Sequence, residues 1–405
     1  MKVLQINATV LSSTGGICRG LADEMNCEGI NNRLIYSLGE VGDSRLDMVK
    51  AGSYSYIKKQ ALLSKLLGNY GFNSAGLTKK LIEITESYQP DIIHLHNLHT
   101  HNCNLEMLFK YFKSRGQRLI WTFHDCWAFT AYCPHFTISG CSGWKTACCR
   151  CPQYKEYSLF FDRSKMLFKK KKELFDGLNL TVVTPSKWLE NTVRQSFFKN
   201  YPVVTIPNGI DTKVFRPTKS NFREAHGIGK NQKMILGVAF DWGYKKGLDV
   251  FISIARTLSA EKYRIVLVGA DESVKRQLPD NVTAIPRTDS QKELAGIYSA
   301  ADVFVNPTRE EVLGLVNIEA NACATPVITF DVGGSPECID KTSGAVVACG
   351  DVDALKKKIE EICFNNIFSA QDCTARAAVF EKRKIYQQYI SLYRDTYDGI
   401  TENRI

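Results

Sequence analysis

Two carboxylates and several glycines that could bind a ligand lie close together in the segment 309–337. The carboxylates are Glu311 and Glu319, and the glycines are Gly314, Gly333 and Gly334. One carboxylate can accept hydrogen bonds from two hydroxyl groups, and glycine lets the backbone approach a ligand closely. The segment therefore predicts a site for a ligand rich in hydroxyl and phosphate groups.

Five of the seven histidines form a second group, between Asp91 and Asp125. They are His94, His96, His99, His101 and His124. Ligands of parallel sheets gather beyond the carboxyl ends of the strands. His124 ends a predicted strand and is followed at once by Asp125, so we expect it to be functional. For the other four we expect hydrogen-bonded structural roles.

Gly15 and Gly16 follow the first predicted strand and precede a helical pattern that extends to Asn26. A glycine pair there brings backbone amides and a helix N-terminus close to a phosphate or sugar. The pair is equally compatible with a plain turn. It lacks the full G-x-G-x-x-G dinucleotide fingerprint, which counts against a simple NAD enzyme.

Cysteines indicate a metal site, because six of the 14 fall between Cys126 and Cys151. Four have seven, six and two residues between them: Cys133, Cys141, Cys148 and Cys151. The final C-x-x-C is typical of tetrahedral thiolate zinc sites, and a metal would order a long loop with little secondary structure. We expect structural zinc, with free thiols as the alternative and Cys126 and Cys149 as spare ligands.

The length of 405 residues predicts two domains of ~200 residues each. Hydrophobic residues make up 44% and charged residues 23%, which excludes disordered and fibrous classes. No apolar run approaches the ~18 residues of a membrane span, and the N-terminus lacks the apolar core of a signal peptide. We therefore expect a cytoplasmic protein whose cysteines are thiols or metal ligands.

The net charge of +10 is unevenly distributed. Residues 1–200 contain 26 Lys and Arg against 16 Asp and Glu, whereas residues 201–405 contain 26 of each. The first half is therefore expected to face a membrane surface, a pyrophosphate-linked acceptor or nucleic acid, or to be merely a solvated basic surface. Its basic segment 162–175, with Lys169 to Lys172 near Phe160, Phe161 and Phe168, is a solvated helix face or a contact for anionic headgroups.

Strand and helix patterns alternate along the chain, which predicts an α/β fold with parallel sheets. In the first half we expect strands at 2–8, 33–37, 91–96, 118–123 and 181–185, and helices at 79–87, 104–115 and 188–197. In the second half we expect strands at 234–239, 264–268, 282–285, 303–306 and 326–330, and helices at 248–258, 291–300, 353–365 and 375–397. Three prolines and an Asn-Gly turn in 201–217 indicate the domain boundary.

The chain resembles family 4 of the GT-B glycosyltransferases, which use nucleotide sugars and retain the anomeric configuration. The resemblance rests on Gly15-Gly16, His124, the P-N-G-I-D segment 207–211, Lys246-Gly247, Glu311 through Glu319, and Gly333-Gly334 with Glu337. These motifs occur in the family's order over nearly the whole chain. The cysteine segment, with its W-x-x-x-C-x-x-C-P ending, further resembles enzymes of bacterial colanic acid, capsule and O-antigen assembly.

The resemblance implies two Rossmann-like domains facing a central cleft. Residues 1–205 would bind the acceptor and contain the cysteine-rich insert 126–152, residues 206–384 would bind the nucleotide sugar, and 385–405 would form a helix that packs back on the first domain. The implied reaction is retaining transfer of a hexose from a UDP- or GDP-sugar to a lipid-linked oligosaccharide. The implied location is the cytoplasmic face of the inner membrane, with the protein bound peripherally.

The resemblance also implies roles for the site residues. Lys246 would stabilise the pyrophosphate, helped by Lys245, by backbone amides near Gly314 and Leu315, and by Asn208 in the same nucleotide-sugar site. Glu319 would hold the ribose, while Glu311 and His124 would contact the donor sugar. Family members commonly have an arginine where this chain has Phe240, so we expect Lys245 to replace it. No Asp-x-Asp metal-binding pair stands at the phosphate end of the site, so we expect catalysis without a divalent cation.

The sequence offers no unambiguous protein nucleophile, and the resemblance implies that retention proceeds by same-face displacement. Two other functions are compatible with parts of the sequence. A GT-B nucleotide-sugar epimerase would share the fold but turn over donor without acceptor. A zinc-stabilised nucleic-acid-binding protein would use the basic half and the cysteines, but it would leave Glu311 and Glu319 without a purpose and lacks a recognisable binding module. We therefore expect no nucleic-acid partner.

Overall fold

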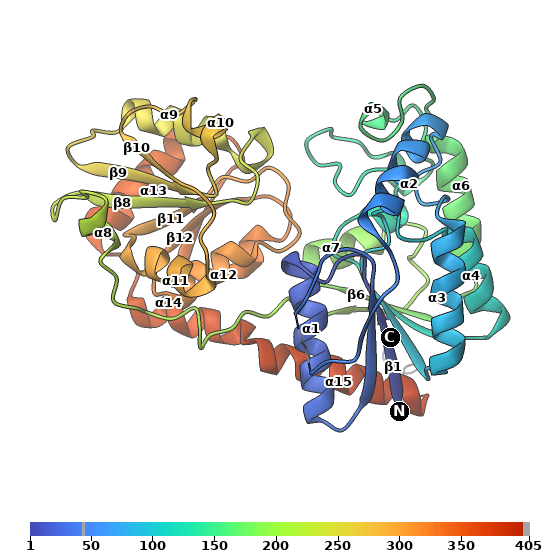
Figure 1. Cartoon of the computed structure of the whole chain (residues 1–405). Coiled ribbons are helices and arrows are strands. Elements are labelled where there is room, and N and C mark those ends of the chain that lie inside the picture. The colour runs from blue at the N-terminus through green and yellow to red at the C-terminus, as the bar shows by residue number, and fades with distance from the viewer. Residues whose placement is uncertain (43–44, 400–405) are drawn as a thin grey trace. The chain divides into compact units, whose positions relative to one another are not determined.

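The computed structural model describes residues 1–42 and 45–399 (Figure 1). The chain divides into two compact units. Unit 1 comprises residues 1–207 together with the chain from Ile385 onward, and unit 2 comprises Asn208–Lys384. Each unit contains one parallel sheet flanked by helices, which confirms the predicted α/β class.

Unit 1 has a seven-stranded sheet in the order β3-β2-β1-β4-β5-β6-β7. The strands are β1 (Lys2–Ile6), β2 (Asn31–Tyr36), β3 (Met48–Lys50), β4 (Ile92–Leu95), β5 (Arg118–Thr122), β6 (Leu180–Thr184) and β7 (Val203–Thr205). All residues of β4 and β6 are buried. Such continuous burial is typical of parallel strands that are covered on both faces.

The helices of unit 1 connect these strands. They are α1 (Ser12–Cys27), α2 (Tyr54–Leu67), α3 (Ala75–Tyr88), α4 (Leu105–Ser114), α5 (Tyr154–Tyr157), α6 (Ser164–Phe175) and α7 (Lys187–Val193). Asn104 and Ser186 cap α4 and α7 with their side chains, as preferred N-cap residues do. The sequence did not predict α2, which buries only Ile57 and Ser64 and therefore lacks a clear apolar stripe.

The last helix, α15 (Lys382–Asp398), completes the core of unit 1. Tyr386, Tyr389, Ile390 and Tyr393 are buried on it, so the predicted one-sided packing is confirmed. The Tyr393 hydroxyl also lies 2.6 Å from Nδ1 of His94 on β4. A hydrogen bond in addition to apolar packing thus fixes α15 on the sheet.

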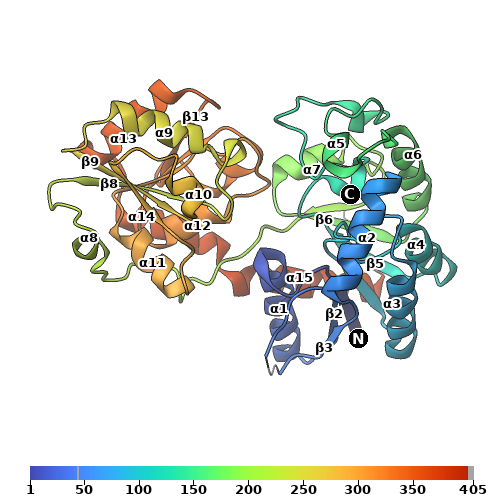
Figure 2. The same ribbon diagram turned by 45° about the horizontal axis from the view of Figure 1, so that its top comes forward.

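Unit 2 has a six-stranded sheet in the order β10-β9-β8-β11-β12-β13. Its strands are β8 (Lys233–Val238), β9 (Tyr263–Val268), β10 (Val282–Ile285), β11 (Val303–Asn306), β12 (Val327–Phe330) and β13 (Gly344–Val347). Its helices are α8 (Phe222–Ala225), α9 (Leu248–Thr257), α10 (Glu272–Lys275), α11 (Gln291–Ala300), α12 (Leu315–Ala322), α13 (Val352–Asn365) and α14 (Ala370–Ala377). Successive β8 residues alternate between two cores, with Leu236 in the core of α11 and α12 and Ile235 in the core of α9 and α13. Figure 2 shows these two pairs of helices on opposite faces of the sheet.

The predicted single helix 375–397 is wrong, because the structure breaks it into α14, a 3-10 turn (Ala378–Phe380) and α15. Glu381 has an extended backbone (φ −59°, ψ 126°) between them. The Ile210 N–H donates to the Phe380 carbonyl at 2.9 Å, and the Lys382 N–H donates to the Ile210 carbonyl at 2.9 Å. Pairing with a distant segment therefore overrides the local helical tendency.

Candidate active site

The predicted carboxylates of unit 2 lie around the N-terminus of α12. Gly314 precedes this helix with a left-handed backbone (φ +80°). A Cβ atom there would lie 3.2 Å from Asn317 Nδ2 and 3.4 Å from Glu311 Cγ. Glycine therefore permits a tight turn that places Glu311 beside the helix N-terminus.

Lys246 and Glu311 form an ion pair, with Nζ 2.9 Å from Oε2. Two backbone features bring them together although they are 65 residues apart. Gly247 has φ +74°, and a Cβ atom there would lie only 2.4 Å from the Pro307 carbonyl oxygen. The Arg309 N–H donates to the Lys245 carbonyl at 2.8 Å. The turn that contains Lys246 is thus held against the loop that contains Glu311.

Lys245 has a different partner, because its Nζ lies 3.4 Å from Oε2 of the buried Glu310. Phe240, at the position of the expected arginine, is 82% exposed. The Arg287 guanidinium lies 5.3 Å from the centre of its ring. Arg287 could not be predicted from the sequence, because no spacing relates it to Phe240.

Glu319 lies on α12 and is held by α11. The buried Tyr298 hydroxyl donates to Glu319 Oε2 at 3.1 Å. Burial raises the pKa of Glu319 to about 7, although the Tyr298 hydrogen bond lowers it. Oε1 makes no hydrogen bond to the residues that the structure describes. This carboxylate can therefore accept hydroxyl donors from a ligand.

Gly333 acts on Glu311 through the backbone. It has φ +59°, and a Cβ atom there would lie 1.7 Å from the Glu311 carbonyl oxygen. No side chain fits between these two segments. In the structure, this predicted close-approach glycine brings two protein segments together and thereby positions Glu311.

His124 lies in unit 1, just after β5, and is partly buried. Its ring is stacked on His96 with centroids 5.4 Å apart, and its Nε2 lies 3.1 Å from His96 Nδ1. Burial lowers the pKa of His124 to about 4; Asp125 raises it and His99 lowers it. His124 is therefore neutral at neutral pH, with one ring nitrogen as donor and one as acceptor.

Asp125 is an ionised partner of His99, at 2.8 Å. Burial would raise the pKa of Asp125, but His99, the Trp127 N–H and His135 bring it to about 2. His94 and His96 are fully buried, and His94 Nε2 lies 2.8 Å from Thr122 Oγ1. Hydrogen-bonded structural roles predicted for these two histidines are confirmed.

The glycine pair lies elsewhere than predicted. Helix α1 begins at Ser12, so Gly15 and Gly16 belong to its first turns and do not precede it. A Cβ atom on Gly15 would lie 2.4 Å from the Val10 carbonyl oxygen, whereas one on Gly16 would meet nothing within 4 Å. Gly15 therefore allows the loop to pack on the helix, and Gly16 keeps the helix surface open.

Asn208 is the first residue of unit 2. Beside it, a Cβ atom on Gly209 would lie 2.5 Å from the Lys382 Cα atom. Asp211 Oδ2 forms an ion pair with Lys382 Nζ at 2.6 Å. The P-N-G-I-D segment is thus packed against the residues that begin α15.

The four predicted metal ligands line one small cavity of about 20 Å³. They are Cys133, Cys141, Cys148 and Cys151, and all are free thiols. Among the described residues, no group of three His, Cys, Asp or Glu side chains is positioned to hold a metal ion. The zinc site therefore stays a prediction.

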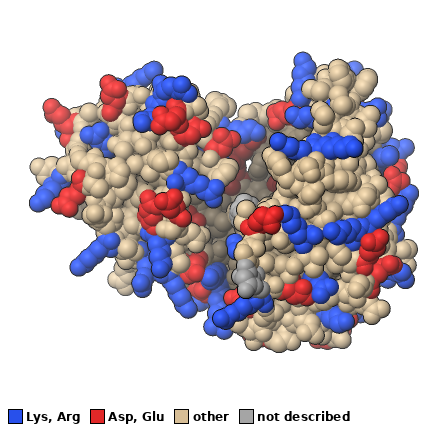
Figure 3. All heavy atoms as spheres, viewed as in Figure 1, with Lys and Arg blue, Asp and Glu red and all other residues tan. Residues whose placement is uncertain are grey.

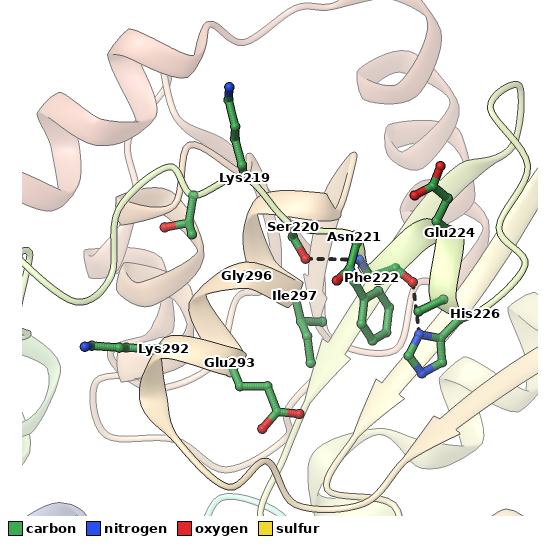
Figure 4. Close-up of a pocket in the computed structure, with 12 residues that line it drawn as sticks. Lys219, Ser220, Asn221, Phe222, Glu224, His226, Lys292, Glu293, Gly296 and Ile297 are labelled. Carbon is green, nitrogen blue, oxygen red and sulfur yellow. Dashed lines mark hydrogen bonds between the residues drawn. The ribbon is translucent and has the colours of Figure 1, made fainter.

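A larger cavity of about 700 Å³ lies in unit 2 between α8 and α11 (Figure 4). Phe222 and His226 stack along one side of it, with ring centroids 4.1 Å apart. Lys219 and Lys292 point away from it. No predicted site residue lines this cavity, so we do not include it in the candidate site.

Comparisons with known proteins agree with these two units. Residues 58–214 match the family described as Glycosyltransferase Family 4, and residues 218–378 match Glycosyl transferases group 1. The chain is 24% identical over 418 aligned positions to Escherichia coli K12 WcaC, named as a colanic acid biosynthesis glycosyl transferase, covering 98% of this chain and 100% of WcaC.

Solved structures show the same fold. Sucrose-phosphate synthase of Thermosynechococcus elongatus superposes with a TM-score of 0.72 at 20% identity, covering 98% of this chain and 99% of the synthase. Anabaena HepE in complex with UDP-glucose gives 0.67 at 14% identity, covering 98% and 100%. The chain is a glycosyltransferase with a family 4 domain, a group 1 domain and the GT-B architecture.

Proposed function

We propose that this enzyme transfers a hexose from a UDP- or GDP-sugar to a lipid-linked oligosaccharide, with retention, during bacterial surface polysaccharide synthesis. The observation that carries the donor half is the arrangement of Lys246, Glu311 and Glu319 about the N-terminus of α12. A helix N-terminus and a fixed cation are the groups that stabilise a departing pyrophosphate.

The ion pair gives Lys246 a defined place. Glu311 Oε1 also accepts the Val312 N–H at 3.1 Å, so the carboxylate itself is fixed. A pyrophosphate arriving at α12 would share Lys246 with Glu311. Glu311 would then be able to accept a hydroxyl of the donor sugar, which is a preorganised arrangement.

Glu319 is suited to the ribose. The Tyr298 hydroxyl donates a hydrogen bond to Oε2. Oε1 can therefore accept hydrogen bonds from the 2′- and 3′-hydroxyl groups of the ribose. Its position within α12, five residues after Gly314, places ribose and pyrophosphate on one short helix. This supports a nucleoside diphosphate as the donor's leaving group.

His124 is our candidate for contact with the donor sugar from unit 1. Its neutral ring can donate one hydrogen bond to a hydroxyl. For retention we propose same-face displacement, in which a donor phosphate oxygen accepts the proton of the attacking hydroxyl as the glycosidic bond to the phosphate breaks. No step requires a divalent cation.

Thermal-shift and calorimetric titration with UDP-, GDP- and ADP-glucose tests the donor site. We expect stabilisation by a UDP- or GDP-sugar, lost in Glu319→Ala and Lys246→Ala, and retained in the control Lys275→Ala, whose side chain is 60% exposed elsewhere in unit 2. If none of the three nucleotide sugars shifts the wild type, the donor site is wrong. An inverted anomeric product by NMR would contradict retention, and donor turnover without acceptor would indicate an epimerase.

The relatives support the direction of this proposal. WcaC is named for colanic acid biosynthesis, and WaaG, whose structure superposes with a TM-score of 0.65, is described as a glycosyltransferase of lipopolysaccharide biosynthesis. Both are polymers of bacterial surfaces. HepE was solved in complex with UDP-glucose, which favours a UDP-sugar over a GDP-sugar as the first donor to test.

The acceptor half of the proposal rests on an apolar patch of unit 1, which we call the leucine-phenylalanine patch. Its members are large exposed side chains of α2 and of the segment before α6: Leu62, Leu66, Leu67, Leu159, Phe160 and Phe161. Phe160 is 65% exposed and Leu62 58%. The Leu159 N–H donates to the Lys65 carbonyl at 2.9 Å, which joins the two segments. Exposed apolar surface of this kind marks interaction sites.

Basic residues lie on α2 and on α6, the helix that follows the second segment of the patch. Lys58, Lys59 and Lys65 are exposed on α2, and Lys165 and Lys169 are exposed on α6. Figure 3 shows rows of basic side chains, in blue, on the face of unit 1 that it displays. Apolar side chains among lysines suit an anionic bilayer, in which the rings enter the headgroup region and the lysines meet phosphates. Within residues 1–42 and 45–399, no helix has the length and apolarity of a membrane span, so we propose peripheral binding.

Cosedimentation with vesicles tests this contact. We expect binding to phosphatidylglycerol-containing vesicles, weaker binding to pure phosphatidylcholine, and loss in Phe160→Ala/Phe161→Ala. Phe364→Ala is the matched control, because Phe364 is 51% exposed in unit 2. Equal vesicle binding by the double variant and the wild type would contradict a membrane role for the patch. Binding of the nucleotide sugar is expected to be the same in both proteins. A salt-dependent shift with nucleic acid in place of nucleotide sugar would favour the nucleic-acid-binding alternative.

A further inference from the structure

We propose that a cavity of unit 1, at the C-terminal end of α6, binds a phosphate monoester group and is a second ligand site beside the candidate active site. The cavity has a volume of about 620 Å³, which is typical of small-molecule sites. It is lined by the turn at Lys145, by the second half of α6 and by the segment 195–201. All of these segments belong to unit 1, so the site is independent of the proposed donor site in unit 2.

The cavity lies away from the residues expected to contact the sugar. Helix α6 ends at Phe175, shortly before β6 begins at Leu180, and the segment 195–201 ends shortly before β7 begins at Val203. The strands of this sheet are parallel, so these segments lie toward the edge where the strands begin. His124 follows the opposite, carboxyl end of β5. A ligand in the cavity would therefore not contact the reacting groups.

The charge of the lining residues favours an anion with two negative charges. Four lysines and two carboxylates line the cavity, which leaves an excess of two positive charges: Lys145, Lys169, Lys172 and Lys199 against Glu173 and Asp176. Lys169 Nζ lies 3.7 Å from Glu173 Oε1. Within the described chain, the other three lysines form no ion pair. A phosphate monoester has a charge of about −1.5 to −2 at pH 7 and would balance this excess.

The three lysines without an ion pair come from three separate segments. Lys145 ends the 3-10 turn Gly143–Lys145, Lys172 lies on α6, and Lys199 precedes β7. Like charges that line one cavity repel each other unless an anion lies between them. A phosphate monoester offers three acceptor oxygens to such donors, whereas a carboxylate offers two oxygens and a single charge. The arrangement therefore favours phosphate over a carboxylate.

Aromatic side chains give the cavity a fixed shape. Phe168 and Phe175 are buried, and the Phe168 ring contacts Phe197 edge to face, with centroids 5.3 Å apart. The Tyr201 hydroxyl donates to the Phe175 carbonyl and accepts the Leu178 N–H at 3.0 Å. Because these contacts hold the walls in place, binding would need to order only the lysine side chains, which keeps its entropic cost low.

The lysine run 169–172 is divided between this cavity and the protein interior. Lys171 is fully buried and donates to the Trp127 carbonyl at 2.7 Å and the Thr130 carbonyl at 3.1 Å. Lys169 and Lys172 line the cavity. The prediction of one solvated helix face is therefore wrong for Lys171, which holds α6 against the segment that follows β5.

Calorimetric titration of the full-length protein with glycerol 3-phosphate, a soluble phosphate monoester, tests the site. We expect binding that is weakened about 10-fold or more in Lys172→Ala/Lys199→Ala, because a hydrogen bond to a charged group contributes that much. Lys172→Arg/Lys199→Arg keeps both charges and should retain binding. The control Lys79→Ala/Lys80→Ala, which removes two exposed lysines of α3, should also retain it. Equal affinity in the wild type and in Lys172→Ala/Lys199→Ala would overturn the site.

Lys246→Ala separates this site from the donor site. We expect that variant to bind glycerol 3-phosphate as the wild type does, even if it no longer binds a nucleotide sugar. If Lys246→Ala loses the phosphate and Lys172→Ala/Lys199→Ala keeps it, the anion occupies the donor site and the proposal is wrong. Failure of the nucleotide sugars to bind would leave the result for glycerol 3-phosphate unchanged.

Vesicles distinguish a lipid-borne phosphate from a soluble one. Phosphatidic acid has a phosphate monoester headgroup, whereas the phosphate of phosphatidylglycerol is a diester. A preference for phosphatidic acid that is lost in Lys172→Ala/Lys199→Ala would identify a lipid headgroup as the source. Binding of glycerol 3-phosphate without such a preference would identify a soluble phosphate ester. If neither probe binds in a manner that depends on Lys172 and Lys199, the cavity is not a phosphate site.

Discussion

The carboxylate of Glu311 lies 2.9 Å from the ammonium group of Lys246, across a turn that Gly247 closes against Pro307. Local sequence does not determine this contact, because the two residues are 65 positions apart in the chain. We expect Lys246→Ala to lower kcat/KM for the nucleotide sugar by about 100-fold or more, because one fixed charge at a developing anion contributes that much. Lys245→Ala, which removes a partner of Glu310 and leaves the Lys246–Glu311 ion pair in place, is expected to have a smaller effect. Steady-state kinetics compare the two, and equal losses would show that the two lysines share the role.

Gly333 is expected to be essential for stability because of close packing, not only because of its backbone angle. Gly333→Ala would place a methyl group 1.7 Å from the Glu311 carbonyl oxygen. Gly350 also has a positive φ (+84°), but a Cβ atom there would meet nothing within 4 Å. Gly350→Ala should therefore cost only the backbone strain, about 1–3 kcal/mol. Denaturant unfolding is expected to show a larger loss for Gly333→Ala, and similar losses would contradict the packing argument.

Glu319 should make stability depend on pH. Its folded-state pKa of about 7 lies above the value in an unfolded chain, so the native state holds the proton more tightly. The contribution of Glu319 to the free energy of unfolding is then fully present below pH ~4.5, and it is lost as the pH rises through about 7. Glu319→Gln is expected to flatten this slope and to raise the unfolding free energy at pH 8 by about 1 kcal/mol.

The same Glu319→Gln variant should bind the nucleotide sugar less tightly than wild type. An amide offers one acceptor oxygen and two donors where the ribose needs acceptors. Chemical denaturation at pH 5, 6.5 and 8, with calorimetric titration at pH 8, measures both effects. If the variant had unchanged donor affinity and increased stability, Glu319 would have a role in the fold and none in donor binding.

Tyr393 is expected to stabilise unit 1 through its hydroxyl. Tyr393→Phe removes the 2.6 Å hydrogen bond to the buried His94 and leaves a polar nitrogen without that partner, which costs about 1–3 kcal/mol. Tyr397, on the same helix and 42% exposed, provides the control. Thermal unfolding of Tyr393→Phe and Tyr397→Phe should differ by several degrees, and equal melting temperatures would contradict this prediction.

Much of the fold could be predicted because buried strands are continuous apolar runs. The bounds of β10, β11 and α11 agree with the prediction residue by residue. Helix α2 was missed because its leucines face solvent, and the break before α15 was missed because Ile210 imposes it from 171 residues away in the sequence. Periodicity reports local burial, but it contains no information about such distant pairing.

The candidate site could be predicted only as a set of residues. Chain position shows that Glu311, Glu319 and Lys246 are present but not that Lys246 opposes Glu311, because the contact depends on how two loops pack. Arg287 had no pattern of its own, and it is identified only by its place over Phe240. Buried Lys171 shows that a charge run on a helix can include one member that points inward.

The position of α15 in the core of unit 1 has a consequence for the order of folding. Unit 1 needs residues that lie before and after unit 2 in the chain, and therefore its core stays incomplete on the ribosome until α15 has been synthesised. Unit 2 is contiguous and can fold first, which reverses the usual order in which N-terminal domains fold during synthesis. A stop codon that removes only α15 would therefore destabilise unit 1 more than unit 2, although unit 2 is next to α15 in the sequence.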